Sequence, residues 1–137
     1  MATDPDIAKF VKAIGAAEPL ANNESYATFR RMFKRHNYFL LDGRFLIIKI
    51  SRSKKPFWGV GKEFIDFLNG LDDYYLVLLV PGNEGWVFSK AEVNTNIRNL
   101  KWKPGHDNDY KINPPLPDAS TFAGPKTFRR KIGIGES

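Results

Sequence analysis

The dipeptide Asp42-Gly43 stands between two runs of strand-forming residues, and it constrains the fold more than any other feature of the sequence. Residues 38–41 precede it and residues 44–51 follow it. Aspartate and glycine both tolerate the positive φ angles of a type I′ turn, so this arrangement predicts a β-hairpin. Both faces of the second run are largely apolar, which predicts a strand inside a sheet.

Apolar periodicity and capping residues predict the remaining elements. Residues 5–14 have helical spacing between a cap at Asp4 and a stop at Gly15. The sequence Ser89-Lys90-Ala91-Glu92 is a capping box at the start of another helix. In full, helices are predicted over 5–14, 24–36, 60–69 and 90–100, and strands over 38–41, 44–51, 74–80, 86–88 and 110–112. This order predicts an α+β fold, with a mixed, largely antiparallel central sheet of about five strands packed with four helices.

The chain changes character after Asn113. Pro114, Pro115 and Pro117 exclude a continued helix and suggest an extended arm. A basic and glycine-containing stretch follows, which is typical of a loosely held tail. We therefore expect one globular domain over residues 1–113, and an extended arm with a basic tail over residues 114–137.

The charge balance favours a polyanionic partner. The 137 residues include 21 Lys and Arg against 15 Asp and Glu, a formal net charge of +6. Such an excess attracts polyanions through counterion release; nucleic acid is the commonest, although an anionic membrane or an acidic protein has the same attraction. The chain has no cysteine, which excludes disulfides, thiol nucleophiles and thiolate zinc sites. With neither a signal-peptide pattern nor a bilayer-spanning apolar run, we expect a cytoplasmic protein without membrane insertion.

Basic residues gather in several clusters, which are the candidates for nucleic-acid binding: Arg30, Arg31, Lys34, Arg35, Arg52, Lys54, Lys55, Lys62, Lys101, Lys103, Arg129 and Arg130. They form either a phosphate-binding surface or ordinary solvated faces. Phe57, Trp58 and Trp102 lie among them. These aromatic side chains suit stacking on exposed bases, and their alternative place is the core.

Three residues around the hairpin form a candidate catalytic set. A metal-dependent nuclease needs carboxylates that converge at a strand end, usually with a lysine nearby. Asp42 at the turn and Glu63 on the next helix are the candidate ligands for Mg²⁺, and Lys49 is the candidate lysine. The alternatives are a turn residue for Asp42 and an exposed helix position for Glu63. Lys49 is flanked by isoleucines, where its amine needs a partner or access to solvent.

The hairpin over residues 38–49, with a polar, basic loop over residues 51–55, the amphipathic helix over 60–69 and the strand over 74–80, resembles the core of the PD-(D/E)xK nuclease superfamily. That superfamily includes many restriction endonucleases and Holliday-junction resolvases, and the resemblance covers about residues 23–103. Asp42 and Lys49 match its motif, Ile47 stands where the motif has an acid, and Glu63 would supply that acid from the helix. The resemblance implies a restriction endonuclease-like core with DNA binding, and cleavage only with a rearranged site.

The sequence leaves three functions open. The first is nucleic-acid binding, most simply of DNA, through the basic loop and tail. The second is an Mg²⁺-dependent endonuclease that uses Asp42, Lys49 and Glu63. The third is an accessory module that binds an acidic protein, or a second copy of the chain, through its aromatic surface and C-terminal arm.

Overall fold

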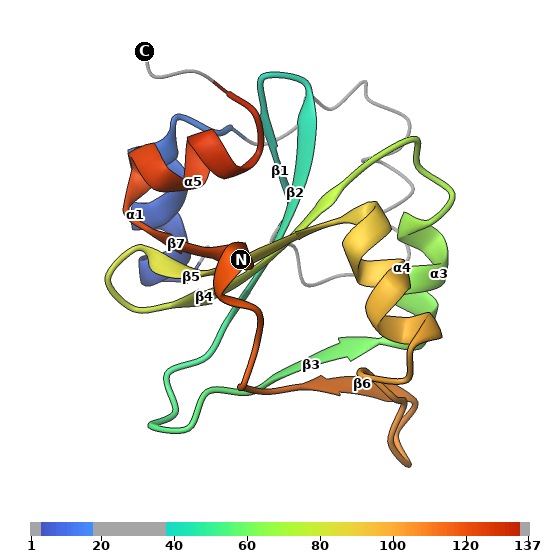
Figure 1. The fold of residues 1–137 in the computed structure, drawn as a ribbon. Helices are drawn as coiled ribbons and strands as arrows, with labels where there is room; N and C mark the ends of the chain where they lie inside the picture. Colours follow the sequence, from blue (N-terminus) through green and yellow to red (C-terminus); the bar gives the residue numbers. More distant parts are fainter. Residues whose placement is uncertain (1–3, 18–37, 135–137) are drawn as a thin grey trace.

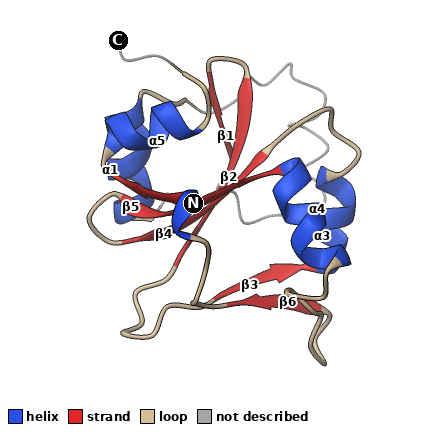
Figure 2. Ribbon diagram, viewed as in Figure 1, coloured by secondary structure: helices blue, strands red, loops and turns tan. Residues whose placement is uncertain are grey.

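The computed structural model describes residues 4–17 and 38–134. These residues form a five-stranded sheet with helices against both of its faces, and a smaller two-stranded sheet on one side (Figures 1 and 2). The elements are α1 (Pro5–Ile14), β1 (Tyr38–Leu41), β2 (Arg44–Ile50), β3 (Trp58–Gly61), α3 (Lys62–Leu68), β4 (Tyr75–Val80), β5 (Glu84–Ser89), α4 (Lys90–Arg98), β6 (Asp109–Ile112), β7 (Thr121–Ala123) and α5 (Pro125–Lys131).

The main sheet has the strand order β1-β2-β4-β5-β7. Only β2 and β4 run parallel, and the other neighbours are antiparallel. A mixed, largely antiparallel five-stranded sheet packed with helices confirms the predicted α+β fold class. In the described part of the chain, no helix is both long and apolar enough to cross a bilayer.

The hairpin β1–β2 forms around the predicted turn. Asp42 has φ 51° and Gly43 has φ 79°, the positive angles that a type I′ turn requires. The register pairs Leu41 with Arg44 and Tyr38 with Ile47. Strand β2 lies between β1 and β4, which confirms that it is internal.

Two hydrophobic cores lie on opposite faces of this sheet. On one face, α1 and α5 cover Phe39, Leu46, Ile48 and Val77. On the other face, α3, α4 and the small sheet cover a second apolar layer, which contains Tyr38, Ile47, Leu76, Leu78 and Phe88. Alternation along the strands places successive residues in the two cores, as expected for a sheet that is covered on both sides.

The two helix caps read from the sequence are present. The Asp4 carboxylate accepts a hydrogen bond from the backbone N–H of Asp6 at 2.9 Å, and Gly15 ends α1 with φ 80°. Ser89 and Glu92 form the capping box of α4, with N–H···O distances of 3.2 and 2.9 Å. The predicted helix over 24–36 lies outside the described residues.

The small sheet differs from the prediction. Residues 58–61, expected to close a loop and enter a helix, form strand β3 instead. Strand β6 pairs with β3 and does not extend the main sheet. The inward side chains of both strands, Trp58, Val60, Tyr110 and Ile112, are buried against the main core, which stabilises the pair.

The segment after the prolines also differs from the expected extended arm. Strand β7 adds to the edge of the main sheet beside β5, and α5 packs against α1. Phe122 and Phe128 are buried, with their ring centroids 5.0 Å apart, and Phe10 of α1 contacts both rings. Burial of these aromatic rings holds residues 121–134 against the main sheet and α1. Pro125 lies in the first turn of α5, where a proline does not interrupt the helix.

Candidate functional site

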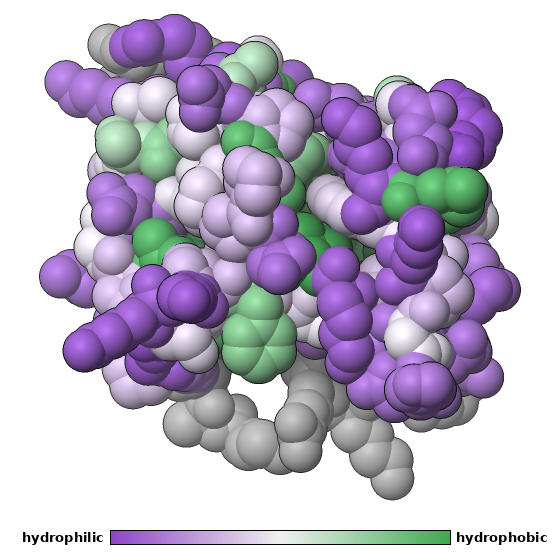
Figure 3. Space-filling view, turned by 60° about the horizontal axis from the view of Figure 1, so that its bottom comes forward, coloured by the Kyte–Doolittle hydropathy of each residue, from purple (hydrophilic) through white to green (hydrophobic). Residues whose placement is uncertain are grey.

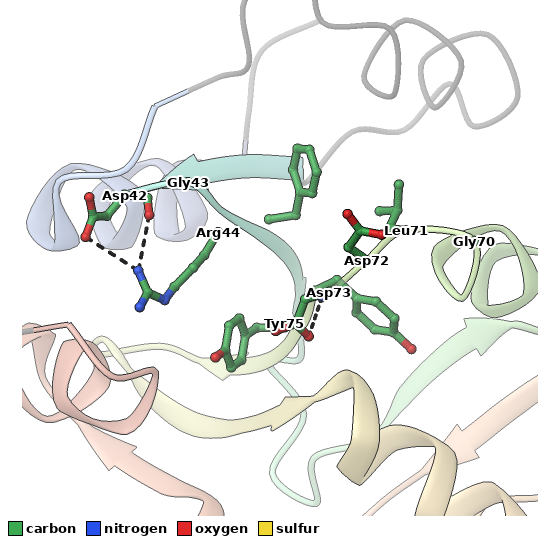
Figure 4. A pocket seen from close by; sticks show the side chains of 10 residues that line it. Asp42, Gly43, Arg44, Gly70, Leu71, Asp72, Asp73 and Tyr75 are labelled. Carbon is green, nitrogen blue, oxygen red and sulfur yellow. Dashed lines mark hydrogen bonds and ion pairs between the residues drawn. The ribbon is translucent and has the colours of Figure 1, made fainter.

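The predicted catalytic aspartate lies at the rim of a hollow of about 650 Å³, between the hairpin turn and the start of β4 (Figure 4). Its side chain is 71% exposed, and the Arg44 guanidinium lies 3.5 Å from the carboxylate. The same guanidinium donates a hydrogen bond to the Asp42 carbonyl at 3.1 Å. Tyr74 also lines the hollow, and burial raises the pKa of its phenol, so this group stays neutral at physiological pH. The exposure of Asp42 and its contacts with Arg44 fit a turn residue.

Lys49 lies at the other end of β2 from Asp42. Seven residue steps of about 3.3 Å place the two residues roughly 20 Å apart. The antiparallel register agrees with this separation. Tyr38, at the end of β1 farthest from the turn, pairs with Ile47, so Lys49 lies beyond the end of β1 that is farthest from Asp42. The prediction that Asp42 and Lys49 converge is therefore wrong. The extended geometry of a strand separates them.

The predicted Mg²⁺ site does not form around these residues. Glu63 is exposed in the first turn of α3 and does not line the hollow that contains Asp42. Within residues 4–17 and 38–134, no group of three or more His, Asp or Glu side chains is placed to hold a metal ion. The Lys49 amine lies over the ring of Phe64, 5.8 Å from its centroid, in a cation–π contact that lowers the cost of its partial burial.

A different site lies where the chain leaves β2. The loop over residues 51–57 begins at the carboxyl end of the parallel pair β2–β4, a common position for ligand-binding loops. Ser51 is buried and its N–H donates to the Leu79 carbonyl at 3.0 Å. The Ser51 hydroxyl accepts hydrogen bonds from the N–H groups of Ser53 at 3.5 Å and Phe57 at 3.3 Å. Both ends of the loop are thus held to the sheet.

Trp58 closes this loop as a core residue. It is 2% exposed, and its indole N–H donates to the Leu79 carbonyl at 3.3 Å. Its ring packs edge-on against Trp86, with the centroids 5.6 Å apart. Of the two places that the sequence left open for Trp58, base stacking is wrong and the core is confirmed, because the fold uses this indole to anchor the loop. Trp102 is also buried, against Phe88.

Arg52 ties the same loop to the N-terminus of α1. Its guanidinium hydrogen-bonds the Asp4 carboxylate and lies 3.0 Å from the Asp6 carboxylate. The hydrogen bond from Arg52 holds the pKa of Asp4 below its usual range, and the two acids raise the pKa of Arg52. Because two carboxylates already neutralise it, Arg52 positions the loop and is poorly suited to bind phosphate.

The loop presents three other side chains to solvent. Lys54 and Lys55 are exposed, and neither takes part in an ion pair in the described part of the chain. Phe57 is 57% exposed. A hollow of about 310 Å³ lies beside Phe57, and Lys49, Arg52 and Gly59 also line it. We call residues 52–57 the basic loop.

The other predicted basic residues have varied surroundings. Lys62 pairs with Asp66 at 3.2 Å, and Arg129 donates to the Ile14 carbonyl at 2.7 Å. Lys101, Lys103 and Arg130 are exposed. The remaining candidates, Arg30, Arg31, Lys34 and Arg35, lie outside the described residues. Figure 3 shows the face at the bottom of Figure 1, toward which β2 runs into the basic loop; hydrophilic side chains cover most of it, with isolated hydrophobic ones between.

The sequence contained a signal for the exposed aromatic ring. From Trp58 to Gly61 large residues alternate with glycine, the period-two pattern of a strand. With Trp58 and Val60 buried, the alternation places Phe57 on the outward side. Comparisons of the chain with protein-family models, with curated proteins and with solved structures each find no match.

Proposed function

We propose that this protein binds nucleic acid, and that Lys54 and Lys55 of the basic loop contact the phosphate backbone. The observation that carries the proposal is the pair of exposed lysines, without an acid partner in the described residues, on a loop that is fixed at both ends. A polyanion can displace counterions from such a pair, which favours binding at low salt.

The anchoring of the loop supports this proposal. A flexible loop loses conformational entropy when it binds a ligand, and a loop that is already ordered loses less. Here Ser51, Arg52 and Trp58 hold the backbone, so the two lysines need only order their own side chains. Two other exposed lysines are less available: Lys62 pairs with Asp66, and Lys111 with Asp107 at 2.7 Å.

The proposal is limited to binding. The similarity to PD-(D/E)xK nucleases stays a prediction, as does a protein partner at the aromatic surface. The strand geometry separates Asp42 from Lys49, so no observation favours cleavage by the predicted set.

Charge reversal in the basic loop tests the proposal. We expect the double variant K54E/K55E to bind a labelled oligonucleotide at least tenfold more weakly than the unmodified protein, measured by fluorescence anisotropy at low salt. The comparison variant is K101E/K103E, which changes the net charge equally at another exposed pair that the sequence also marks as a candidate, so the two variants decide between the pairs. Equal loss in both variants would place the binding outside the loop and contradict the proposal.

A further inference from the structure

We further propose that the ligand of the basic loop is single-stranded nucleic acid, and that the Phe57 ring stacks on one of its bases. This inference rests on the proposed function, since Lys54 and Lys55 supply the phosphate contacts beside the ring. Among the described residues, only Phe57 and Leu100 are large hydrophobic side chains that are exposed. Of the two, Phe57 lies in an anchored loop next to acid-free lysines.

The backbone holds this ring outward. The Phe57 N–H donates to the buried Ser51 hydroxyl at 3.3 Å, and the next residue, Trp58, is fixed in the core. Strand alternation therefore directs the Phe57 side chain away from the core. The exposure of the ring follows from these two anchors, so a ligand that covers the ring can do so without reordering the loop.

A hollow beside the ring leaves room for a ligand. Gly59, the next outward position after Phe57, has no side chain to fill it. A hollow of about 310 Å³ lies between Phe57, Gly59 and Lys49, at the lower end of the size range of small-ligand pockets. A planar base therefore has space against the ring.

Both an acidic and a basic side chain lie near the Phe57 ring. Asp109 places its carboxylate over Gly59, 3.6 Å from where a Cβ at this position would lie. A phosphate is repelled from this carboxylate and attracted to Lys54 and Lys55, which precede Phe57 in the loop. The carboxylate can instead accept a hydrogen bond from an N–H group on a base, such as the ring N3–H of thymine or uracil. The surface thus fits a strand whose phosphates follow the lysines and whose base meets the ring.

A single strand fits this arrangement better than a duplex. In a duplex the base faces are covered by their stacked neighbours, whereas a single strand offers them to aromatic side chains. Such stacking contributes about 1–3 kcal/mol per base when measured by substitution with alanine, which corresponds to roughly fivefold to 150-fold in affinity. Lysines alone would not distinguish the two forms in this way.

The test compares Phe57 variants on matched ligands. The 137-residue protein is titrated with labelled oligothymidylate and oligouridylate of about 12 nucleotides, within the range of known single-strand sites, and with a hairpin duplex. We expect F57A to weaken binding of both single strands roughly tenfold and to change duplex binding less than about twofold. F57W should restore the affinity, and its indole fluorescence should be quenched when a single strand binds.

The outcomes separate this inference from the proposed function. If single strands bind through Lys54 and Lys55 but F57A binds them as tightly as the unmodified protein, the single-strand inference is wrong and the lysine site stands. If no oligonucleotide binds, both are wrong. If F57A instead loses binding to phosphatidylserine vesicles while oligonucleotide binding is unchanged, the ring contacts a membrane surface and the inference is overturned. Because the Phe57 ring is exposed, the F57A variant should have the same thermal unfolding midpoint as the unmodified protein.

Discussion

At the scale of single residues, Asp4 joins two parts of the molecule. Its carboxylate caps α1 by accepting the Asp6 N–H, and it also hydrogen-bonds Arg52 of the basic loop. One side chain therefore fixes both a helix start and the loop that we propose as the binding site. The two contributions can be separated, because asparagine caps a helix about as well as aspartate but carries no charge.

We expect D4A to lower the free energy of unfolding by about 1 kcal/mol at neutral pH, because it loses the cap. D4N should lose less, since it keeps the cap and loses only a solvent-exposed ion pair. Urea denaturation at pH 7 measures both variants. Equal destabilisation by D4N and D4A would contradict the capping role of Asp4.

The acid branch of the stability curve tests the ion pair itself. Arg52 lowers the pKa of Asp4 in the folded protein below its ordinary value of 3.8. The ionised carboxylate therefore stabilises the fold at pH values above that ordinary value, and this stabilisation is lost as the pH falls through the lowered pKa. Between pH 5 and pH 2, the stability of D4N should fall less steeply than that of the unmodified protein. Parallel curves would show that the pair contributes nothing.

At the scale of elements, the aromatic contact between α1, β7 and α5 holds the C-terminal segment in the fold. Phe128 is fully buried, and its ring lies 5.0 Å from both Phe10 and Phe122. We expect F128A to lower the free energy of unfolding by about 3–5 kcal/mol, because it leaves a cavity among these rings. The control K126A, at an exposed position of the same helix, should change it by less than about 0.5 kcal/mol. A small effect of F128A in urea denaturation would show that this segment is not part of the core.

The elements that the sequence predicted are those with local signals. The Asp42-Gly43 turn, the Asp4 cap and the Ser89 capping box each depend on residues a few positions apart. The pairing of β3 with β6 and the addition of β7 to the sheet join segments far apart in the chain. Nothing near Trp58 or Phe122 specifies those partners, because the pairing depends on shared burial.

The contrast between local and long-range contacts also explains which features of the candidate site could be predicted. The separation of Asp42 from Lys49 could have been predicted, because a two-residue turn fixes the hairpin register and places its residues at one end. The ion pairs of Arg52 could not have been predicted, because its partners Asp4 and Asp6 lie at the start of a helix more than forty positions earlier in the chain. Base stacking and the core were both open for Phe57 and Trp58, and the strand β3, which was not predicted, decides that Trp58 is buried and Phe57 exposed.

For the molecule as a whole, the distribution of the charges indicates where a polyanion can bind better than the net charge of +6 does. Ion pairs neutralise Arg52, Lys62 and Lys111 locally. A polyanion is therefore expected to contact the cations that have no such ion pair. Lys54 and Lys55 are two of these, and both lie on an ordered loop. This distribution predicts a localised site and a dependence on salt that can be assigned to named residues.

The salt dependence of oligonucleotide binding is the most direct test of this account. The logarithm of the binding constant should fall linearly with the logarithm of the salt concentration. The slope for K54E/K55E should be shallower by about two than that of the unmodified protein, because each phosphate contact contributes close to one. The slope for K101E/K103E should stay nearly unchanged. Binding of nucleic acid through Lys54 and Lys55 is contradicted if the unmodified protein binds no oligonucleotide at low salt, or if both double variants change the slope equally.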